Sequence, residues 1–308
     1  MSNPLISARG LTKKFGDFTA VNGIDFDVYK GESFGFLGPN GAGKSTAMRI
    51  IGATSQRTSG TISVLEKDPD VNGPQIRAHL GVVPQQDNLD MQLSVAENLY
   101  IYGRYFGLPK GFVKKKVDEL LAFAQLEEKR DAKVETLSGG MKRRLTIARA
   151  LVSEPEILML DEPTTGLDPQ ARHILWDRLF RLKEQGVTLL ITTHFMDEAE
   201  QLCDRLIVMD KGTIMAEGSP ASLIKDYSTK EVLELRFGSD RNQSMAEQLR
   251  AMCERIEDLP DRFLMYTEDG EALLEKIYDA NLHPKTSLVR RSSLEDVFLR
   301  LTGRTLIE

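Results

Sequence analysis

The sequence is poor in cysteine and contains no long apolar run. Its two cysteines, Cys203 and Cys253, lie far apart, and neither belongs to a CxxC or Cys/His cluster. We therefore expect two reduced thiols in a cytosolic protein, and neither a disulfide framework nor a zinc site. The apolar stretch at 187–191 is only five residues long, whereas a membrane-spanning helix needs about 20 apolar residues. If this protein moves something across a membrane, another polypeptide must form the path.

The sequence also lacks a secretory signal, an internal repeat and an excess of basic residues. Residues 1–14 contain no apolar core of the secretory type. The net charge is −6 and the sequence pI is about 5.5. This acidic balance argues against a protein built to grip a nucleic-acid backbone, so we expect no nucleic-acid partner. With 41% hydrophobic and 28% charged residues, the composition is typical of a globular protein with a sizeable core.

Hydrophobic periodicity predicts an α/β fold. Apolar runs that read as buried strands alternate with segments of helical spacing, which indicates a mainly parallel sheet covered on both faces. Three helical segments in succession interrupt this alternation and should form a lobe of their own. The predicted strands are 5–11, 18–28, 33–37, 157–160, 187–192, 206–209, 213–217, 233–237, 263–267 and 286–290. The predicted helices are 45–52, 94–106, 112–125, 139–152, 170–185, 196–202, 245–256, 271–281 and 294–301.

A glycine-rich turn between a predicted strand and a predicted helix matches the pattern GxxxxGK[ST]. Its glycines allow backbone N–H groups to converge on phosphate oxygens, and the helix N-terminus adds partial positive charge. Lys44 is expected to reach the β- and γ-phosphates, and the Ser45 hydroxyl to ligate Mg²⁺. The predicted phosphate-binding residues are Gly38, Pro39, Asn40, Gly41, Ala42, Gly43, Lys44, Ser45 and Thr46.

A second candidate site follows the apolar strand at 157–160. The strand ends in Asp161 and Glu162, and strand ends are where an α/β sheet presents ligand-binding groups. We expect Asp161 to hold Mg²⁺ and Glu162 to be the general base that polarises the attacking water. These two motifs alone specify only a P-loop nucleotidase.

The segment LSGGM at 137–141 narrows the prediction, because it resembles the signature motif of the ABC ATPase superfamily. Further motifs that resemble this family occur in the family's order along residues 15–194. They contain an aromatic that matches the adenine-stacking position, the Q-loop glutamine, the D-loop aspartate and the switch histidine. These residues are Phe15, Gln85, Asp168 and His194.

The resemblance implies that two ATP molecules are bound between two head-to-tail copies of the chain. Ser138 and the amides of Gly139 and Gly140 would contact the γ-phosphate of the ATP that the partner's P-loop holds. Lys44, His194 and the partner copy's signature serine would stabilise charge in the transition state, while Glu162 acts as the general base. Gln85 would sense Mg²⁺ and the γ-phosphate. Mg²⁺ would thus be held by Ser45, Gln85 and Asp161.

Two positions depart from the family pattern. Met141 stands where many members have glutamine, but Ser138 and the two glycine amides would still supply phosphate contacts. Phe15 stands where the family has tyrosine, which keeps the π face and loses only a hydroxyl. We therefore expect activity to survive both departures.

The implied fold is a P-loop NTPase of the ABC type, with a RecA-like core, a β-subdomain and an inserted helical subdomain over about residues 88–152. We expect this ATP-binding domain to span 1–228 and a small α/β domain to span 229–308. Within the latter, Ser293 and Asp296 resemble a helix capping box. Residues 293–304 also look like the tail of daunorubicin-resistance and nodulation-type exporter ATPases.

That branch implies a homodimer on the cytoplasmic face of the inner or plasma membrane. Its partner would be a separate permease of about six helices, and its cargo a drug, a lipid-linked saccharide or a similar amphipathic molecule. Two alternatives stay open: an importer ATPase, and an ABC protein that acts on ribosomes or DNA. Ribosome-type members usually carry two ATPase domains in one chain, and DNA-repair types carry long insertions before the signature. Neither feature is present in this sequence.

Overall fold

The computed structural model describes residues 3–238 and 243–303. Its contacts divide the chain into two compact units, Met1–Ser219 and Pro220–Glu308. The division falls nine residues (228 − 219) before the boundary expected from the sequence, because helix α8 (Pro220–Tyr227) packs on the C-terminal helix α11 (Leu294–Thr302). Arg304, at the end of the predicted tail motif, lies outside the described residues. None of the described helices is both long and apolar enough to cross a membrane.

The centre of the first unit is a six-stranded sheet, and its strand order explains where the candidate site forms. The order is β5-β6-β7-β3-β8-β9. All neighbouring strands run parallel except the β8–β9 pair, which confirms the predicted sheet. The carboxyl ends of β3, β6 and β7 therefore meet at one edge. The strands are β3 (Ser33–Leu37), β5 (Leu80–Val83), β6 (Ile157–Asp161), β7 (Thr188–Thr193), β8 (Arg205–Asp210) and β9 (Thr213–Gly218).

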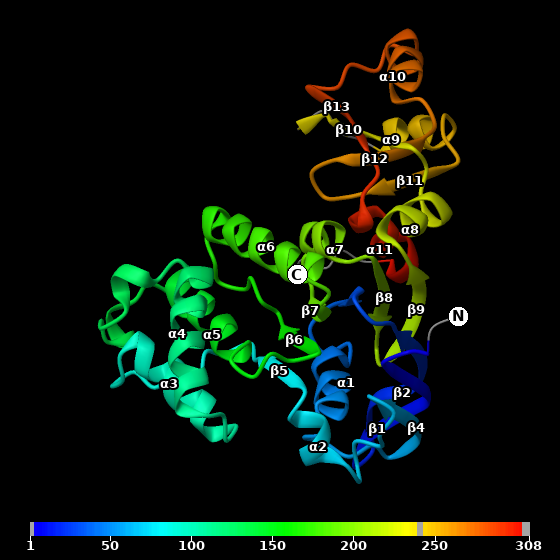
Figure 1. The fold of residues 1–308 in the computed structure, drawn as a ribbon. Coiled ribbons are helices and arrows are strands. Elements are labelled where there is room, and N and C mark those ends of the chain that lie inside the picture. Colours follow the sequence, from blue (N-terminus) through cyan, green and yellow to red (C-terminus); the bar gives the residue numbers. More distant parts are fainter. Residues whose placement is uncertain (1–2, 239–242, 304–308) are drawn as a thin grey trace. The chain divides into compact units, whose positions relative to one another are not determined.

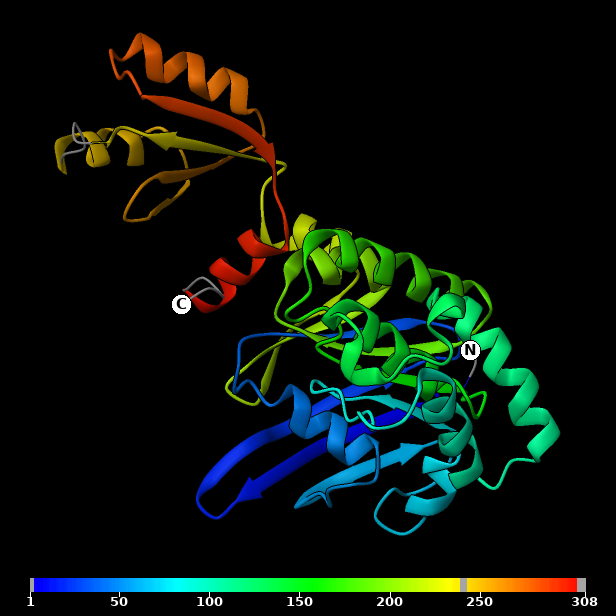
Figure 2. The ribbon, with the colours of Figure 1, turned by 90° about the vertical axis from the view of Figure 1, so that its left-hand side faces the viewer.

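A second, antiparallel sheet of order β2-β1-β4 completes the core of this unit. Its strands are β1 (Ile6–Phe15), β2 (Phe18–Val28) and β4 (Ser59–Val64). Helix α1 (Lys44–Ile51) contacts β2 of this sheet and β6 of the central sheet, and Figure 2 shows it between the two. Apolar side chains of both sheets and of α1 form one buried cluster. This shared core fixes α1, and hence the loop before it, against the sheet edge.

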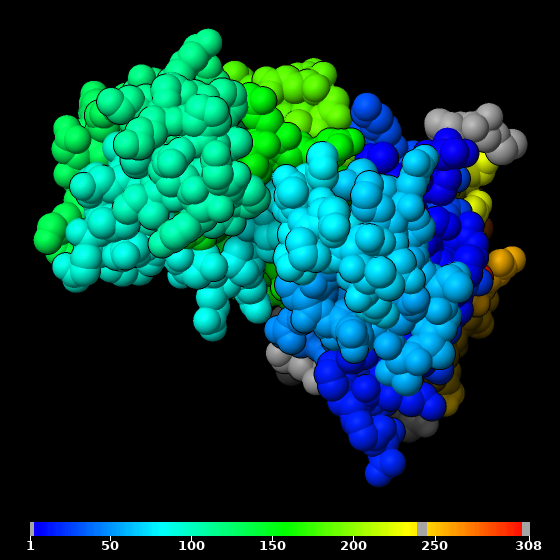
Figure 3. Space-filling view, turned by 60° about the horizontal axis from the view of Figure 1, so that its bottom comes forward, coloured from blue at the N-terminus to red at the C-terminus, as the bar shows by residue number. Residues whose placement is uncertain are grey.

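The remaining helices of the first unit fall into two groups. Three of them pack on one another beside the central sheet, and Figure 1 shows them together on its left-hand side. In the space-filling view, the cyan-green surface to which α3 and α4 contribute lies on the left and the dark-blue surface of the N-terminal strands on the right, with a lighter-blue surface between them (Figure 3). The first group is α3 (Val95–Tyr105), α4 (Lys110–Ala124) and α5 (Gly139–Ala150), with 3₁₀ turns at Glu127–Lys129 and Val134–Thr136. The others are α2 (Gly73–Arg77), α6 (Pro169–Glu184) and α7 (Met196–Leu202).

The second unit contains a four-stranded antiparallel sheet of order β11-β12-β10-β13. The helix predicted over 245–256 is wrong in its second half. Helix α9 ends at Arg250, and Ile256 lies in strand β11, where it pairs with Met265. Strand pairing therefore overrides the helical spacing of the apolar residues. The elements besides α8 and α11 are β10 (Glu231–Arg236), α9 (Gln243–Arg250), β11 (Arg255–Asp258), β12 (Phe263–Thr267), α10 (Gly270–Asp279) and β13 (Thr286–Arg291).

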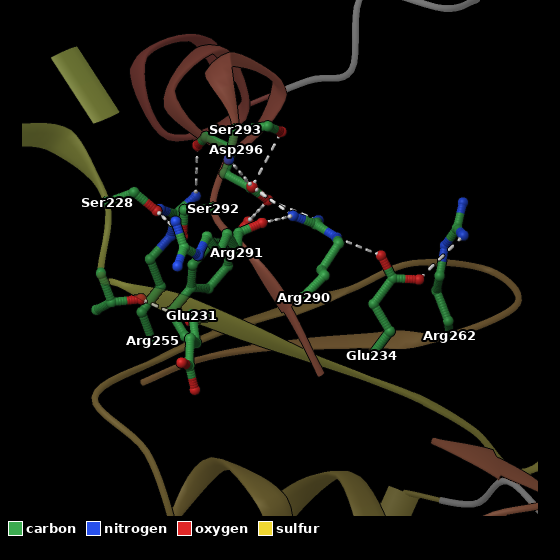
Figure 4. Close-up of polar contacts among 12 residues, drawn as sticks. Ser228, Glu231, Glu234, Arg255, Arg262, Arg290, Arg291, Ser292, Ser293 and Asp296 are labelled. Atoms are coloured by element: carbon green, nitrogen blue, oxygen red, sulfur yellow. Dashed lines mark hydrogen bonds and ion pairs between the residues drawn. The ribbon is translucent and has the colours of Figure 1, made fainter. Parts of the chain in front are cut away.

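A buried carboxylate joins α11 to the sheet of the second unit (Figure 4). Asp296 is 1% exposed, and Arg290 donates to both of its oxygens at 2.7 and 2.9 Å. The Ser293 amide donates to Asp296 Oδ2 at 2.8 Å, which confirms the predicted capping box. The Tyr266 hydroxyl lies 3.1 Å from Asp296 Oδ1. Although burial raises it, the hydrogen bonds from Arg290 and Ser293 hold the pKa of Asp296 below its ordinary value.

We expect Asp296→Asn to destabilise α11 and β13 by about 2 kcal/mol at pH 7, because it removes the buried carboxylate that accepts two charge-assisted hydrogen bonds from Arg290, which keeps only its ion pair with Glu234. The folded-state pKa is depressed, so this stabilisation is complete above the unfolded value of about 3.9 and is lost as the pH falls through the folded value. Hydrogen exchange of α11 and β13 amides measures it. The exposed Asp261, which pairs with Arg236 and Arg262, is the control, and Asp261→Asn should cost less than about 1 kcal/mol. Equal protection in the two variants at pH 7 contradicts the prediction.

Candidate functional site

The glycine-rich loop joins the end of β3 to the start of α1. Gly43 precedes the helix with φ 101°, a left-handed conformation that favours glycine. A Cβ at Gly43 would overlap the carbonyl oxygen of Ala20, and one at Gly38 would overlap that of Met209. Both glycines are therefore required by close backbone packing. The loop runs over the sheet edge and leads into α1, as the sequence predicted.

Lys44, the first residue of α1, is 4% exposed and folds back over this loop. Its Nζ donates to the carbonyl oxygens of Gly38 at 2.6 Å and Pro39 at 3.0 Å. It also lies 3.9 Å from Glu162 Oε1. Burial lowers the pKa of Lys44, and the charges of Glu162 and Asp161 oppose that effect. The ammonium is thus held at the start of α1, beside the carboxylates that end β6.

The first of these carboxylates, Asp161, contacts two hydroxyl groups. Ser45 Oγ donates to Asp161 Oδ1 at 3.0 Å, and Thr192 Oγ1 donates to the same oxygen. Ser45 belongs to α1 and Thr192 to β7, so the three side chains join the predicted phosphate loop to the neighbouring strand ends. Sequence reasoning missed Thr192. Its position one strand over from Asp161, at the end of an apolar run, is the signal that could have found it.

The second carboxylate, Glu162, is the point on which the site converges. Glu162 is 6% exposed and has φ 46°, so its backbone adopts a left-handed turn directly after the strand. Gln85 Nε2 donates to Glu162 Oε2 at 2.9 Å, and Thr165 Oγ1 donates to it at 3.2 Å. His194 Nδ1 lies 3.3 Å from Glu162 Oε1. The structure therefore brings Lys44, Gln85, Glu162 and His194 together from segments more than 30 residues apart (85 − 44, 162 − 85 and 194 − 162).

A cavity of about 430 Å³ opens beside these groups. Phe18, at the start of β2, lines it and is 63% exposed. Phe15, the predicted adenine-stacking residue, is 53% exposed and pairs with Phe18 across the β1–β2 hairpin, but it does not line this cavity. Sequence reasoning missed Phe18, although it lies three residues from Phe15. The residues that line the cavity are Phe18, Ala20, Asn40, Gly41, Ala42, Gly43, Lys44, Ser45, Thr46, Gln85 and Glu162.

The signature residues and the D-loop residue Asp168 lie elsewhere in the first unit. Ser138 caps α5 by accepting a hydrogen bond from the Met141 amide at 3.3 Å. Asp168 caps α6 in the same way, at 2.8 Å from the Ala171 amide. A Cβ on Gly140 would approach Ala171, whereas one on Gly139 would meet no other atom. Among the described residues, neither Ser138 nor Asp168 lines the cavity beside Lys44.

The donor set beside the cavity suits a hard divalent cation. Ser45 and Asp161 present a hydroxyl and a carboxylate 3.0 Å apart, and the Gln85 side chain carries an amide oxygen. Oxygen donors of these kinds, with few carboxylates, are those that Mg²⁺ takes in phosphate-binding sites. The residues present therefore fit the predicted metal.

Comparison with known proteins agrees with this geometry. Residues 21–165 match the family described as "ABC transporter", and residues 242–303 match "Nodulation factor export protein NodI, C-terminal domain". Among solved structures, cbiO1 from Clostridium perfringens, part of an ABC transporter complex, is 31% identical with a TM-score of 0.68, covering 73% of this chain and 92% of that one. The ATP-binding cassette MJ0796, solved as a dimer bound to ADP and Pi, is 29% identical with a TM-score of 0.63, covering 70% and 98%.

Two curated relatives extend over nearly the whole chain. The "Nod factor export ATP-binding protein I" of Rhizobium sp. (strain N33) is 48% identical over 307 residues, covering 99% of each chain. The protein of the same name from Ralstonia nicotianae is 45% identical over 314 residues, covering 99% of this chain and 96% of that one. The predicted ABC-type fold and the predicted exporter branch are thereby confirmed. The chain belongs to the ATP-binding subunits of ABC transporters, in the family of the Nod factor export ATP-binding proteins I.

Proposed function

We propose that this ABC ATPase hydrolyses ATP at the cavity beside Lys44, with Glu162 as the general base. The observation that supports this assignment is the convergence of Lys44, Gln85 and His194 on the Glu162 carboxylate. A general base must lie within hydrogen-bonding reach of the water that it activates. Glu162 lines the cavity that the phosphate-binding loop also lines, which supports this role.

Other groups of the site bind the phosphates, neutralise charge, orient the base and stack on the adenine ring. The amides of Gly41 and Gly43 and the N-terminus of α1 receive phosphate oxygens, while Lys44 neutralises charge on the transferred phosphoryl group. His194 lies 3.3 Å from Glu162 and orients its carboxylate. It also donates a hydrogen bond to the negative charge that develops on the transferred phosphoryl group. The exposed aromatic hairpin tip, with Phe15 and Phe18, offers π faces for the adenine ring.

The proposed metal is Mg²⁺, held by Ser45, Asp161 and Gln85. When bound, it supplies positive charge that screens the phosphate oxygens and lowers the barrier to displacement. The protein prepares this site by fixing Asp161 between the hydroxyls of Ser45 and Thr192. The same contact with Asp161 orients the Ser45 hydroxyl.

The working form is proposed to be a homodimer in which Ser138, Gly139, Gly140 and Asp168 complete the partner's nucleotide site. Two facts support this. In the described chain these residues do not line the cavity of their own subunit, and Ser138 begins a helix whose N-terminus suits an anion. The related cassette MJ0796 was solved as a dimer with ADP and Pi.

The partner in the membrane is proposed to be a separate permease of about six helices, with this chain bound peripherally on its cytoplasmic side. The relatives named Nod factor export proteins support export over import and over action on ribosomes or DNA. The proposed cargo is therefore a lipid-linked saccharide or a similar amphipathic molecule.

Lys44→Met tests the assignment of the cavity. It keeps the length of the side chain but removes a charge-assisted contact worth about 1.5–3 kcal/mol, so ATP should bind about 10- to 100-fold more weakly. Isothermal titration with ATP and Mg²⁺ measures this loss, and phosphate release should fall with it. The control is Lys129→Met, on the exposed 3₁₀ turn Glu127–Lys129. If Lys44→Met bound and hydrolysed ATP as the wild type does, the proposal that ATP binds in this cavity would be wrong.

A further inference from the structure

Arg143 lies in the middle of the helix that Ser138 caps, yet its side chain is directed into the protein. It is 4% exposed and belongs to α5, which contacts β5, an edge strand of the central sheet (Figure 1). Neither the phosphate-binding motif nor the signature motif assigns it a role. A buried arginine is costly unless each of its N–H groups finds an acceptor.

Every N–H group of the Arg143 guanidinium is engaged. Its Nε donates to the Pro163 carbonyl at 2.7 Å, and its Nη2 donates to the carbonyls of Asp161 at 3.1 Å and Glu162 at 3.2 Å. Its Nη1 donates to the Pro84 carbonyl at 2.5 Å and lies 3.3 Å from Asp87 Oδ1. One planar group with five donors therefore meets five acceptors on two loops.

Three of these acceptors are successive carbonyls that flank the left-handed turn at Glu162. A non-glycine residue in that conformation costs about 1–3 kcal/mol and persists only where its surroundings hold it. The turn directs the Glu162 carboxylate toward Lys44 and His194. The guanidinium donates hydrogen bonds to all three carbonyls and thereby stabilises this turn.

The other two acceptors belong to the loop that carries Gln85. Arg143 holds the Pro84 carbonyl directly before Gln85, and Thr146, one turn further along α5, donates to Asp87 at 2.9 Å. Gln85 in turn donates to the Glu162 carboxylate. Arg143 therefore fixes both partners of the Gln85–Glu162 hydrogen bond through their backbones.

We propose that Arg143 is a positioning residue for hydrolysis: its guanidinium fixes the backbone turn at Glu162 and ties that turn to the helix that Ser138 caps. The inference rests on the proposed function, in which Ser138 contacts the partner's ATP and Glu162 is the base. When Ser138 contacts that ATP, a movement of α5 is transmitted through the five hydrogen bonds of Arg143 to Glu162 of the same subunit. The residue thereby links the occupancy of one nucleotide site to the geometry of the other.

Arg143→Lys tests the proposal in the full-length chain, because it keeps the charge but loses the planar fork. A displacement of about 1 Å at the base can lower a rate about 10²-fold, so kcat for ATP should fall about 10- to 100-fold. The Kd for ATP and the KM should stay within about twofold, since Arg143 does not line the cavity. A loss of ATP binding equal to the loss of kcat would show a merely structural role and overturn the proposal, as would a kcat within twofold of the wild type.

Arg144→Lys is the matched control. Arg144 is the next residue of α5, and its described hydrogen bonds go to Ala124 and Gln125 at the end of α4. Its variant should keep kcat within about twofold; a loss equal to that of Arg143→Lys counts against the proposal.

Glu162→Gln separates this inference from the proposed function. Full turnover in Glu162→Gln overturns both. Lost turnover in Glu162→Gln with normal turnover in Arg143→Lys overturns only the role of Arg143. Adding Arg143→Lys to Glu162→Gln should lower the residual rate by less than about twofold, because both changes act on one group.

Discussion

Glu162→Gln is expected to lower the rate of phosphate release from ATP by about 10²- to 10⁴-fold, the range that general-base catalysis contributes. Glutamine has nearly the same shape and can keep the hydrogen bonds with Gln85 and Thr165 through its amide group. It cannot accept a proton from water. ATP binding should therefore persist while turnover stops, and the ATP-bound dimer should accumulate on gel filtration in the presence of ATP and Mg²⁺.

The exposed Glu128, on the 3₁₀ turn Glu127–Lys129, gives a control for this substitution. Glu128→Gln should release phosphate at the wild-type rate and show no ATP-dependent dimer beyond that of the wild type. Unimpaired turnover in Glu162→Gln would assign the proton transfer to another group. His194, 3.3 Å from Glu162, would then be the next residue to replace.

The parts of the site that could be predicted from the sequence are those encoded by local spacing. A phosphate-binding loop is one contiguous segment, and so is an apolar strand that ends in Asp161 and Glu162. The strand-loop-helix order around Lys44 also fixed which ends of the strands would carry ligand-binding groups. The convergence on Glu162 agrees with motifs that the family resemblance had already placed in order.

Other parts could not be predicted because they depend on backbone acceptors or on pairing between distant segments. The Arg143 guanidinium binds carbonyl groups, which every residue type carries, so no side-chain pattern marks its partners. In the second unit, Ile256 continues the helical spacing of Met245 and Leu249, yet it pairs in β11 with Met265. Strand β11 is only four residues long and contains one apolar residue, Ile256, so it shows no alternation of apolar and polar side chains.

The second large effect is expected from Ser138→Arg, which places a bulky side chain at the N-terminus of α5. In the proposed dimer, Ser138 reaches the partner's γ-phosphate, and losing one such donor costs about 10²- to 10³-fold in rate. Because Ser138 does not line the cavity of its own subunit, a single subunit should still bind ATP within about twofold of the wild-type Kd. Combined with Glu162→Gln, the substitution should also abolish the ATP-dependent dimer on gel filtration.

Ser94→Arg separates this effect from the loss of a helix cap. Ser94 caps α3 as Ser138 caps α5, by accepting a hydrogen bond from the third amide of the helix, so both variants lose about 1 kcal/mol of capping. Only Ser138→Arg should prevent dimerisation and hydrolysis. If Ser138 acted on the ATP of its own subunit, its variant would bind ATP weakly as a monomer. A persistent ATP-dependent dimer in the Ser138→Arg, Glu162→Gln protein would show that α5 does not face the partner's nucleotide. In that case Arg143 would not connect Glu162 to the nucleotide site of the partner subunit.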